Sequence, residues 1–286
     1  MTDVALDPLP APAARPIAAA SSFYNAVLTR RVDQHESLAF FWVAYTGEPV
    51  AFEPGQYLTI GVESDGKLLQ RPYSVASSPR DAADGYEFYV RLVDGGLFTP
   101  LLWRLDVGQG MSMKGPKGKF ILEPGDERIH VFISSGTGIA PFISMMKTLI
   151  ADGAPRRAVV LHGVSYAEDL GYRDLLEDWQ ASGEYPVTYV PSVSRPAAPE
   201  NARWTGRTGR VETIINDAYD DLGLTTADSI AYICGNPDMI LAVEETLQGR
   251  GFPEEQIKKE LYWPKGKAPT AAPRIAAAID PSAPQT

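Results

Sequence analysis

Four short motifs carry residue types that bind phosphate groups or support redox chemistry. The first is Arg71-Pro72-Tyr73-Ser74, which follows Gly55-Gln56-Tyr57 along the chain. An arginine fork can hold a pyrophosphate with two parallel hydrogen bonds. A tyrosine two residues further on lies on the same side of a strand, so its ring can cover a flavin, and the Ser74 hydroxyl can bond near the reactive flavin nitrogen. The alternative is an ordinary edge strand with one exposed arginine.

The second motif is Gly95-Gly96-Leu97-Phe98-Thr99-Pro100. Its glycines allow backbone amides to approach a phosphate, and Thr99 adds a hydroxyl donor. A glycine-rich hairpin turn explains the same residues equally well.

The third motif, Ser134-Ser135-Gly136-Thr137-Gly138-Ile139-Ala140-Pro141, follows a predicted strand and opens a predicted helix. Gly136 and Gly138 permit close approach of the backbone to a dinucleotide, and the positive end of a helix favours a diphosphate. Pro141 suits a first helical turn because no amide hydrogen is missed there. The motif differs from the common G-x-G-x-x-G fingerprint, since position 141 is proline and no acidic ribose ligand is identifiable downstream.

The fourth motif, Cys234-Gly235-Asn236-Pro237, also stands where a strand gives way to a helix. A lone cysteine is usually a small buried hydrophobic residue. At the end of a strand, however, its thiol faces the same crevice as the dinucleotide loop. Cys234 is therefore predicted to pack against a nicotinamide ring without covalent chemistry.

Arginines crowd the stretch from residue 192 to 210, which is unusual in so acidic a chain. They are Arg195, Arg203, Arg207 and Arg210. One or two of them could bind the 2′-phosphate that distinguishes NADP from NAD. A solvated loop is the alternative.

Two types of secondary structure must position these motifs. Residues 23 to about 122 show short strand-like runs, such as Tyr57–Val62 and Tyr86–Val93, separated by turn residues, which indicates an antiparallel barrel. Gly108 and Gly115–Lys119 are interpreted as connections of its last strands. After residue 126, apolar strand-length runs alternate with amphipathic helix-length runs, which is typical of a parallel sheet covered on both faces. The predicted strands are 129–134, 158–164, 187–192 and 230–234, and the predicted helices are 139–152, 169–182, 211–219 and 237–250.

Composition limits the kinds of protein that this chain can be. The 286 residues, 44% of them hydrophobic, suffice for two cores, and no run approaches the roughly 20 apolar residues that span a bilayer. A net charge of −10 argues against nucleic-acid binding. One cysteine excludes an iron-sulfur cluster held by cysteines of this chain alone, and three histidines without ligand spacing make a metal site improbable. The N-terminus lacks the features of a secretory signal, so we expect a cytoplasmic location. We also expect a soluble and monomeric protein.

Together, the four motifs resemble those of the ferredoxin (flavodoxin)–NADP(H) reductase family, in particular its compact bacterial members. The similarity runs from about Phe23 to Trp263, with the motifs in the family's order. It implies an all-β antiparallel FAD-binding barrel followed by an α/β parallel-sheet domain that binds NAD(P). The expected division is an N-terminal segment without order at 1–22, the barrel at 23–125, the nucleotide domain at 126–263 and a C-terminal extension at 264–286.

The resemblance also implies a role for each matching residue. Cofactor binding falls to Arg71, Pro72, Tyr73, Ser74, Thr99, Gly136, Thr137, Gly138, Arg195, Arg210, Tyr262 and Trp263. Tyr262 would cover the flavin and Trp263 would stack on the FAD adenine. The predicted catalytic residues are Ser74, Cys234 and Glu260, and no metal is expected.

Two features depart from the family pattern. Compact bacterial members commonly have an arginine after a strand-end His-Gly-Val, whereas this chain has Ser165 after His162-Gly163-Val164, which weakens the expected NADP preference. The chain also continues to Thr286 instead of ending near the closing aromatic residue. This extension has three interpretations: it controls nicotinamide entry, forms a partner surface, or is disordered.

The resemblance implies hydride exchange between NADP(H) and FAD, and single-electron exchange with ferredoxin or flavodoxin. One alternative is an NADH-dependent FAD reductase component of an oxygenase system. Another is a non-catalytic subunit that keeps the fold and binds flavin.

Overall fold

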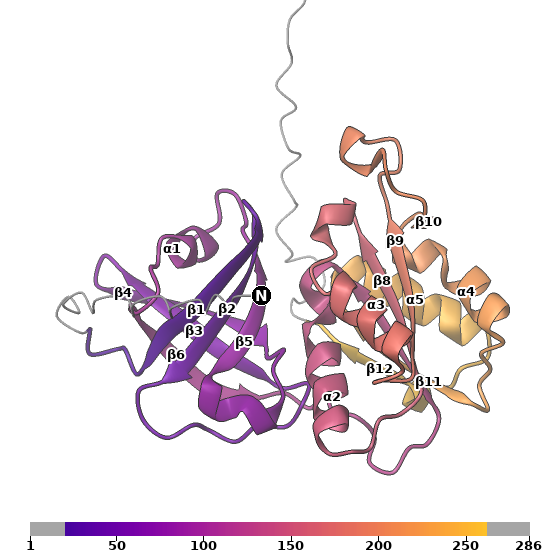
Figure 1. The fold of residues 1–286 in the computed structure, drawn as a ribbon, viewed down its shortest axis with the longest axis horizontal. Helices are drawn as coiled ribbons and strands as arrows, with labels where there is room; N and C mark the ends of the chain where they lie inside the picture. Colours follow the sequence, from indigo (N-terminus) through magenta and orange to yellow (C-terminus); the bar gives the residue numbers. More distant parts are fainter. Residues whose placement is uncertain (1–20, 262–286) are drawn as a thin grey trace, which may run out of the picture.

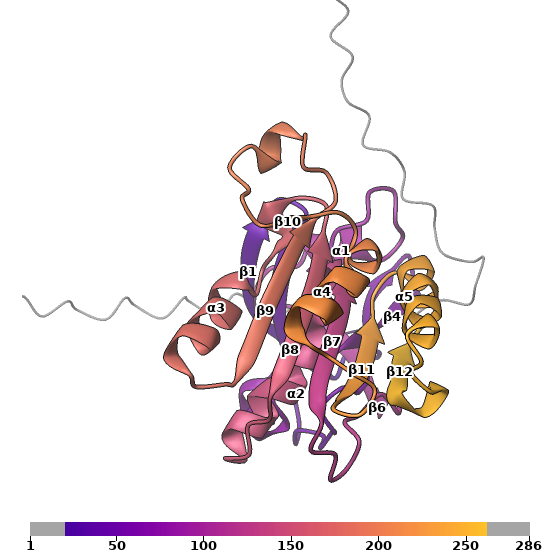
Figure 2. The same ribbon diagram turned by 90° about the vertical axis from the view of Figure 1, so that its right-hand side faces the viewer.

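The computed structural model describes residues 21–261, which form two six-stranded sheets of different type (Figure 1). All strand pairs of the first sheet are antiparallel, and all those of the second are parallel. Helices cover the parallel sheet on both faces (Figure 2). The predicted fold class is therefore confirmed. Tyr262 and Trp263 lie outside the described residues, as do most of the predicted N-terminal segment and the C-terminal extension.

The antiparallel sheet curls into a barrel with strand order β4-β3-β6-β1-β2-β5. The two edge strands, β4 and β5, approach one another just beyond the end of β4, where the Ala76 N–H donates to the carbonyl of Glu87 on β5 at 2.8 Å. Alternate residues of its strands fill a core that includes Phe41, Ile60 and Phe88. The strands are β1 (Ala26–His35), β2 (Leu38–Tyr45), β3 (Tyr57–Ser64), β4 (Lys67–Ser74), β5 (Tyr86–Arg91) and β6 (Gly110–Lys117), with a short helix α1 (Thr99–Trp103) and a 3-10 turn at Pro79–Asp84.

One prediction for the barrel was wrong in part. Gly115–Lys119 was interpreted as a connection, but β6 continues through Gly115 and Pro116 to Lys117, which pairs with Tyr57. The pairing of β3 with β6 shifts register at this point. An irregularity of this kind tolerates a proline, which has no amide hydrogen for the ladder, and a glycine at positive φ, here +131°.

The parallel sheet has strand order β10-β9-β8-β7-β11-β12. Its strands are β7 (Ile129–Ser135), β8 (Ala158–Val164), β9 (Val187–Val193), β10 (Arg207–Thr208), β11 (Ser229–Cys234) and β12 (Ile257–Glu260). Its helices are α2 (Ala140–Ala151), α3 (Arg173–Ser182), α4 (Ile215–Leu222) and α5 (Pro237–Gly249). Each predicted strand and helix of this region is present, with small shifts at the ends. Strands β10 and β12 were not predicted, because they are too short to show periodicity.

The two faces of the parallel sheet pack against different partners. On the outer face, α4 and α5 cover an aliphatic cluster that includes Val131, Ile133 and Ile233 (Figure 2). On the other face, α2 and α3 pack in one continuous core with residues of the barrel, among them Phe40 and Tyr89. The barrel and the parallel sheet therefore share a buried interface.

Aromatic rings and ion pairs join the two sheets at this interface. Phe40 stacks on Tyr89 at a centroid distance of 4.7 Å, and Tyr172, which directly precedes α3, meets Phe40 edge-on at 5.0 Å. Asp169, 3% exposed, accepts from Arg91 at 2.6 Å and lies 3.0 Å from the His35 ring. Because these contacts are directional as well as buried, they restrain the orientation of one sheet relative to the other.

Candidate functional site

The carboxyl ends of β7, β11 and β12 bring three side chains into one row. Cys234, the last residue of β11, pairs with Ser134 of β7 and with Glu260, the last residue of β12. Paired residues on neighbouring strands face the same side of a sheet, so these three side chains point toward the same face. Cys234 is fully buried in the core that α2 and the barrel share.

The barrel contributes Ser74 to the same place. Ser74 ends β4 and is 5% exposed, and its hydroxyl donates to Oε2 of Glu260 at 3.4 Å. The two residues lie 186 positions apart in sequence. The structure thus gathers Ser74, Glu260 and Cys234, the three predicted catalytic residues, where the end of β4 meets the carboxyl edge of the parallel sheet.

Arg71 and Tyr73 precede Ser74 on β4, which is the first strand in the order of the antiparallel sheet. They alternate with Pro72 and Ser74, so their side chains leave the strand on one side. The Tyr73 ring packs against Phe98 at a centroid distance of 6.0 Å, and burial raises the pKa of Tyr73 well above its usual value, so the phenol stays neutral. Arg71 Nη1 donates to the carbonyl of Gln70 at 2.7 Å. A half-buried guanidinium beside a neutral ring suits a pyrophosphate and a flat cofactor.

Thr99 begins α1 and is 6% exposed. Its hydroxyl oxygen accepts from the Val93 N–H at 2.9 Å, across a turn that contains Gly95 at a φ of +69°. The glycine-rich turn, which was the alternative interpretation of this motif, is present, and Thr99 closes it, since its hydroxyl also donates to the Val93 carbonyl at 3.5 Å. A phosphate could reach this loop through its remaining backbone amides.

The Gly136–Gly138 motif forms a 3-10 turn between β7 and α2. A Cβ on Gly136, whose φ is +54°, would meet no atom of the described residues within 4 Å. A Cβ on Gly138 would lie 2.4 Å from the carbonyl oxygen of Cys234. The two glycines therefore differ: Gly136 leaves open space where a ligand can approach, and Gly138 lets the turn touch the end of β11.

The segment after Cys234 locks onto the same turn. Asn236 N–H donates to Ser135 Oγ at 2.9 Å, and the Asn236 side chain caps α5 by accepting from the amides of Asp238 and Met239. Gly235, with φ of +145°, allows this close approach, since a Cβ there would lie 2.4 Å from Ser135 Oγ. From the sequence, Asn236 was predicted only as part of the Cys234–Pro237 motif, without a role of its own. Asparagine before proline at a strand end is a cap signature that reveals its role.

The two arginines predicted to contact a 2′-phosphate lie beyond the ends of β9 and β10. Arg195 stacks over the Tyr166 ring at 5.3 Å and donates to its hydroxyl. Arg210, whose side chain is 73% exposed, lies 3.8 Å from Glu212. Because β9 and β10 are parallel neighbours, both arginines stand at the same edge of the sheet as the Gly136 turn. Arg207 forms a 2.6 Å ion pair with Asp221 instead.

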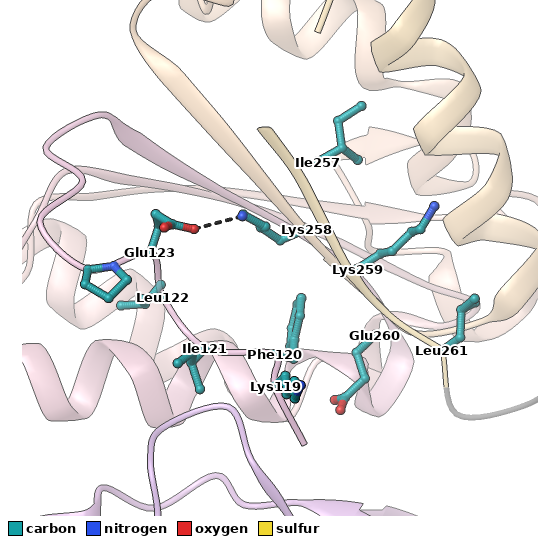
Figure 3. A pocket seen from close by; sticks show the side chains of 11 residues that line it. Lys119, Phe120, Ile121, Leu122, Glu123, Ile257, Lys258, Lys259, Glu260 and Leu261 are labelled. Carbon is teal, nitrogen blue, oxygen red and sulfur yellow. Dashed lines mark ion pairs between the residues drawn. The ribbon is translucent and has the colours of Figure 1, made fainter. Parts of the chain in front are cut away.

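The segment that joins the two sheets forms a pocket beside Glu260. The pocket, about 540 Å³, lies between residues 119–124 and 257–261. Glu123 and Lys258 face one another across it, 2.8 Å apart, and Glu260 lies toward its other end (Figure 3). This pocket was not predicted from the sequence, because β12 was not predicted.

The residues present fit a flavin dinucleotide and a nicotinamide dinucleotide. Gly136 offers an open approach at the start of α2, where amide dipoles favour a diphosphate. Arg71 offers a guanidinium, and Ser74 and Glu260 meet where the two sheets join. Within residues 21–261, no group of three or more His, Cys, Asp or Glu side chains could hold a metal ion. No helix in that range is long and apolar enough to cross a membrane.

Two family models match the two sheets separately. The oxidoreductase FAD-binding domain model matches residues 28–121, and the oxidoreductase NAD-binding domain model matches residues 132–245.

Similar proteins include reductases with different electron acceptors. A ferredoxin–NADP reductase B from Sorangium cellulosum is 32% identical over 219 residues, which is 76% of this chain and 87% of the relative. The reductase component DmpP of a Pseudomonas phenol 2-monooxygenase is 29% identical, over 84% of this chain and 65% of its own length. The chain thus spans just under two thirds of that oxygenase component.

Solved structures share the fold. A ferredoxin–NADP⁺ reductase from Neisseria gonorrhoeae, with bound FAD and NADP, superposes with a TM-score of 0.72 at 23% identity, over 85% of this chain and all of that one. The Amycolatopsis cytochrome P450 reductase GcoB gives a TM-score of 0.71 at 27% identity, over 84% of this chain and 70% of the other.

Proposed function

Because the chain belongs to the ferredoxin–NADP reductase family of FAD- and NAD(P)-binding oxidoreductases, we propose that it exchanges a hydride between NADP(H) and FAD. It passes the electrons singly to or from ferredoxin or flavodoxin. The observation that carries this proposal is the contact of Ser74, from the barrel, with Glu260, from the parallel sheet. A reaction between two cofactors held on two sheets needs such a meeting point.

The residues of this site have separate tasks in the proposal. Arg71, Pro72, Tyr73 and Thr99 hold FAD, and Gly136, Thr137 and Gly138 hold the nicotinamide dinucleotide. FAD, when bound, supplies the change between hydride transfer and single-electron transfer. Ser74 and Glu260 place a hydroxyl and a carboxylate where the rings would meet, and the buried Cys234 limits the space beside them. Tyr262 and Trp263 are assigned to the flavin ring and its adenine by sequence alone.

Cys234 offers a direct test of this arrangement. Anaerobic stopped-flow reduction of the flavin should be clearly slower in Cys234→Ala, because a smaller side chain no longer restrains the nicotinamide. Reduction at the unchanged rate would remove Cys234 from the hydride step.

Arg195 and Arg210 are proposed to select NADPH over NADH. Both stand at the edge of the sheet that carries the Gly136 turn, and the Arg210 side chain is largely exposed, with its ion pair to Glu212 stretched to 3.8 Å. One charge-assisted contact to a 2′-phosphate should favour NADPH by at least about tenfold in kcat/KM. Steady-state comparison of the two nucleotides tests this, and equal efficiency would contradict it.

A second candidate is the NADH-dependent reductase component of an oxygenase system. Ser165 favours it, since this position lacks the arginine common in compact relatives, and so does the similarity to oxygenase reductase components. A purified protein that oxidises NADH at least as efficiently as NADPH would support this candidate.

A non-catalytic flavin-binding subunit is the third possibility. The absorbance spectrum of the purified protein, followed by anaerobic titration with each nucleotide, separates it from the two enzymes. A yellow protein that neither nucleotide bleaches would be such a subunit.

The proposal includes a division of the chain near residue 125, which agrees with the last antiparallel strand ending at Lys117 and the first parallel strand starting at Ile129. It also includes a cytoplasmic location and a monomeric state. Light scattering coupled to size exclusion tests the latter, and a stable dimer would contradict it.

A further inference from the structure

His162 lies beside the predicted dinucleotide turn and has no task in the proposed reaction. It is near the end of β8, is fully buried, and pairs in register with Ser134 of β7. Its Nε2 lies 2.9 Å from the carbonyl oxygen of Gly136, and its Nδ1 lies 3.3 Å from the Tyr189 hydroxyl.

These two partners determine which ring nitrogen carries the proton. A carbonyl oxygen only accepts, so Nε2 must be the donor to Gly136. Nδ1 is then the acceptor of the Tyr189 hydroxyl proton. Burial lowers the pKa of His162 to about 4 and raises that of Tyr189 well above its usual value. Near neutral pH the ring is therefore uncharged and held in one tautomer.

The hydrogen bond to Gly136 also orients the amide that follows it. In a trans peptide the C=O and the next N–H point in opposite directions. Fixing the Gly136 carbonyl toward β8 therefore fixes the Thr137 N–H on the side away from His162. Two glycines in three residues would otherwise leave this turn many conformations, and ordering it on binding would weaken affinity.

A second contact restrains the turn from the opposite side. Gly138 packs against the carbonyl of Cys234 on β11, whereas His162 belongs to β8, and β7 runs between these strands. The turn is therefore held from both neighbouring strands before any ligand arrives.

We propose that His162 is a positioning residue, which orients the Gly136–Gly138 turn through the Gly136 carbonyl for the diphosphate that NADH and NADPH share. This rests on the proposed assignment of the turn to a nicotinamide dinucleotide. It distinguishes His162 from Arg195 and Arg210, which are assigned to the 2′-phosphate that only NADPH carries.

The test compares variants of the FAD-loaded protein by the dissociation constants of NADP⁺ and NAD⁺, measured from the perturbation of the flavin spectrum. His162→Phe keeps a ring but removes the donor, and should raise both constants by about the same factor, on the order of tenfold. His162→Gln keeps an N–H near the Nε2 position and should retain more affinity than His162→Phe.

His130→Phe is the matched control. His130 is also a fully buried histidine, on β7, but it lies at the opposite end of that strand from the Gly136–Gly138 turn. If His162 acted only by filling space, both phenylalanine variants would alter thermal stability and neither would alter nucleotide affinity. Unchanged constants in His162→Phe would therefore overturn the proposal, and so would a rise confined to NADP⁺.

Two further measurements keep the test decisive if His162→Phe does not fold. Tyr189→Phe removes only the hydroxyl that fixes the tautomer, and should raise both constants about two- to threefold. Nitrogen-15 NMR of labelled histidine in the unchanged protein should show His162 protonated at Nε2, and protonation at Nδ1 would overturn the proposal. If the unchanged protein binds neither nucleotide, the proposed function fails instead.

Discussion

The two faces of the parallel sheet are built from the same strands but differ in chemistry. The outer face, under α4 and α5, is a mainly aliphatic cluster that also contains Tyr219 and Phe252. The barrel-facing side carries both buried histidines of the sheet, His130 and His162, together with Cys234.

Within residues 21–261, polar contacts from the barrel reach this second face. Glu87 of β5 accepts from Lys147 of α2 at 2.6 Å and from Tyr172 at 2.7 Å. Ser144 of α2 donates to the Ser77 carbonyl at 2.7 Å. Apolar packing is not directional, whereas hydrogen bonds and ion pairs are. The outer face therefore supplies stability, and the barrel-facing side sets alignment.

The largest expected effect is a loss of unfolding free energy in acid, which should arise on the barrel-facing side. Burial lowers the pKa of His130 and of His162 to about 4, below the 6.5 of an unfolded histidine. Between these values the unfolded chain binds more protons, so stability is full above pH 6.5 and falls as the pH drops toward 4. The loss should be up to about 3 kcal/mol for each histidine.

Urea unfolding at several pH values measures this loss. The slope of the unfolding free energy against pH, between pH 6.5 and 4, should be shallower in His130→Phe. The difference should correspond to at most one bound proton. An unchanged slope in that variant would place the acid sensitivity elsewhere in the molecule.

The outer face should respond to the loss of volume without a change in the site. Ile133→Ala removes a fully buried side chain from β7 on that face and should cost about 3 kcal/mol of unfolding free energy. Nicotinamide nucleotide affinity, measured well below the unfolding temperature, should stay within about twofold. If affinity falls while stability holds, the division of tasks between the two faces is wrong.

Gly138 and Gly136 provide a paired test of the turn. Gly138→Ala places a Cβ against the Cys234 backbone and should cost up to about 3 kcal/mol of stability and most nucleotide affinity. Gly136→Ala meets no protein atom within 4 Å and strains a positive φ, at a cost of about 1 kcal/mol of stability, while its Cβ enters the space left for the ligand. Thermal unfolding of both variants measures the contrast, and equal losses of stability would show that the contact with β11 is unimportant.

The interface itself should show the smallest of these effects. Glu87→Gln removes the charge that Lys147 faces, and because a quarter of the Lys147 side chain is exposed we expect a loss of about 2 kcal/mol. Glu177→Gln is the control, since both side chains of its ion pair with Arg173 are nearly half exposed and the pair should be worth less than about 0.5 kcal/mol. Urea unfolding of both variants decides whether the buried contact matters more.

Local sequence determined much of the architecture. The change from strand-and-turn rhythm to alternating strands and helices after residue 126 gave the two sheet types, because side-chain periodicity is set within a few residues. The glycines at 136 and 138 and Pro141 marked the turn that opens α2. Cys234 and Gly235 marked the end of β11 in the same way.

Tertiary structure alone decided which of these features meet. The pairing of Cys234 with both Ser134 and Glu260 depends on strand order and register, and β12 is only four residues long. The contact of Ser74 with Glu260 depends on the packing of two sheets. The bond from His162 to Gly136 depends on β8 lying beside β7. Residues far apart in a sequence carry no local signal of their neighbours, since strand register and interface geometry arise only when whole sheets pack together.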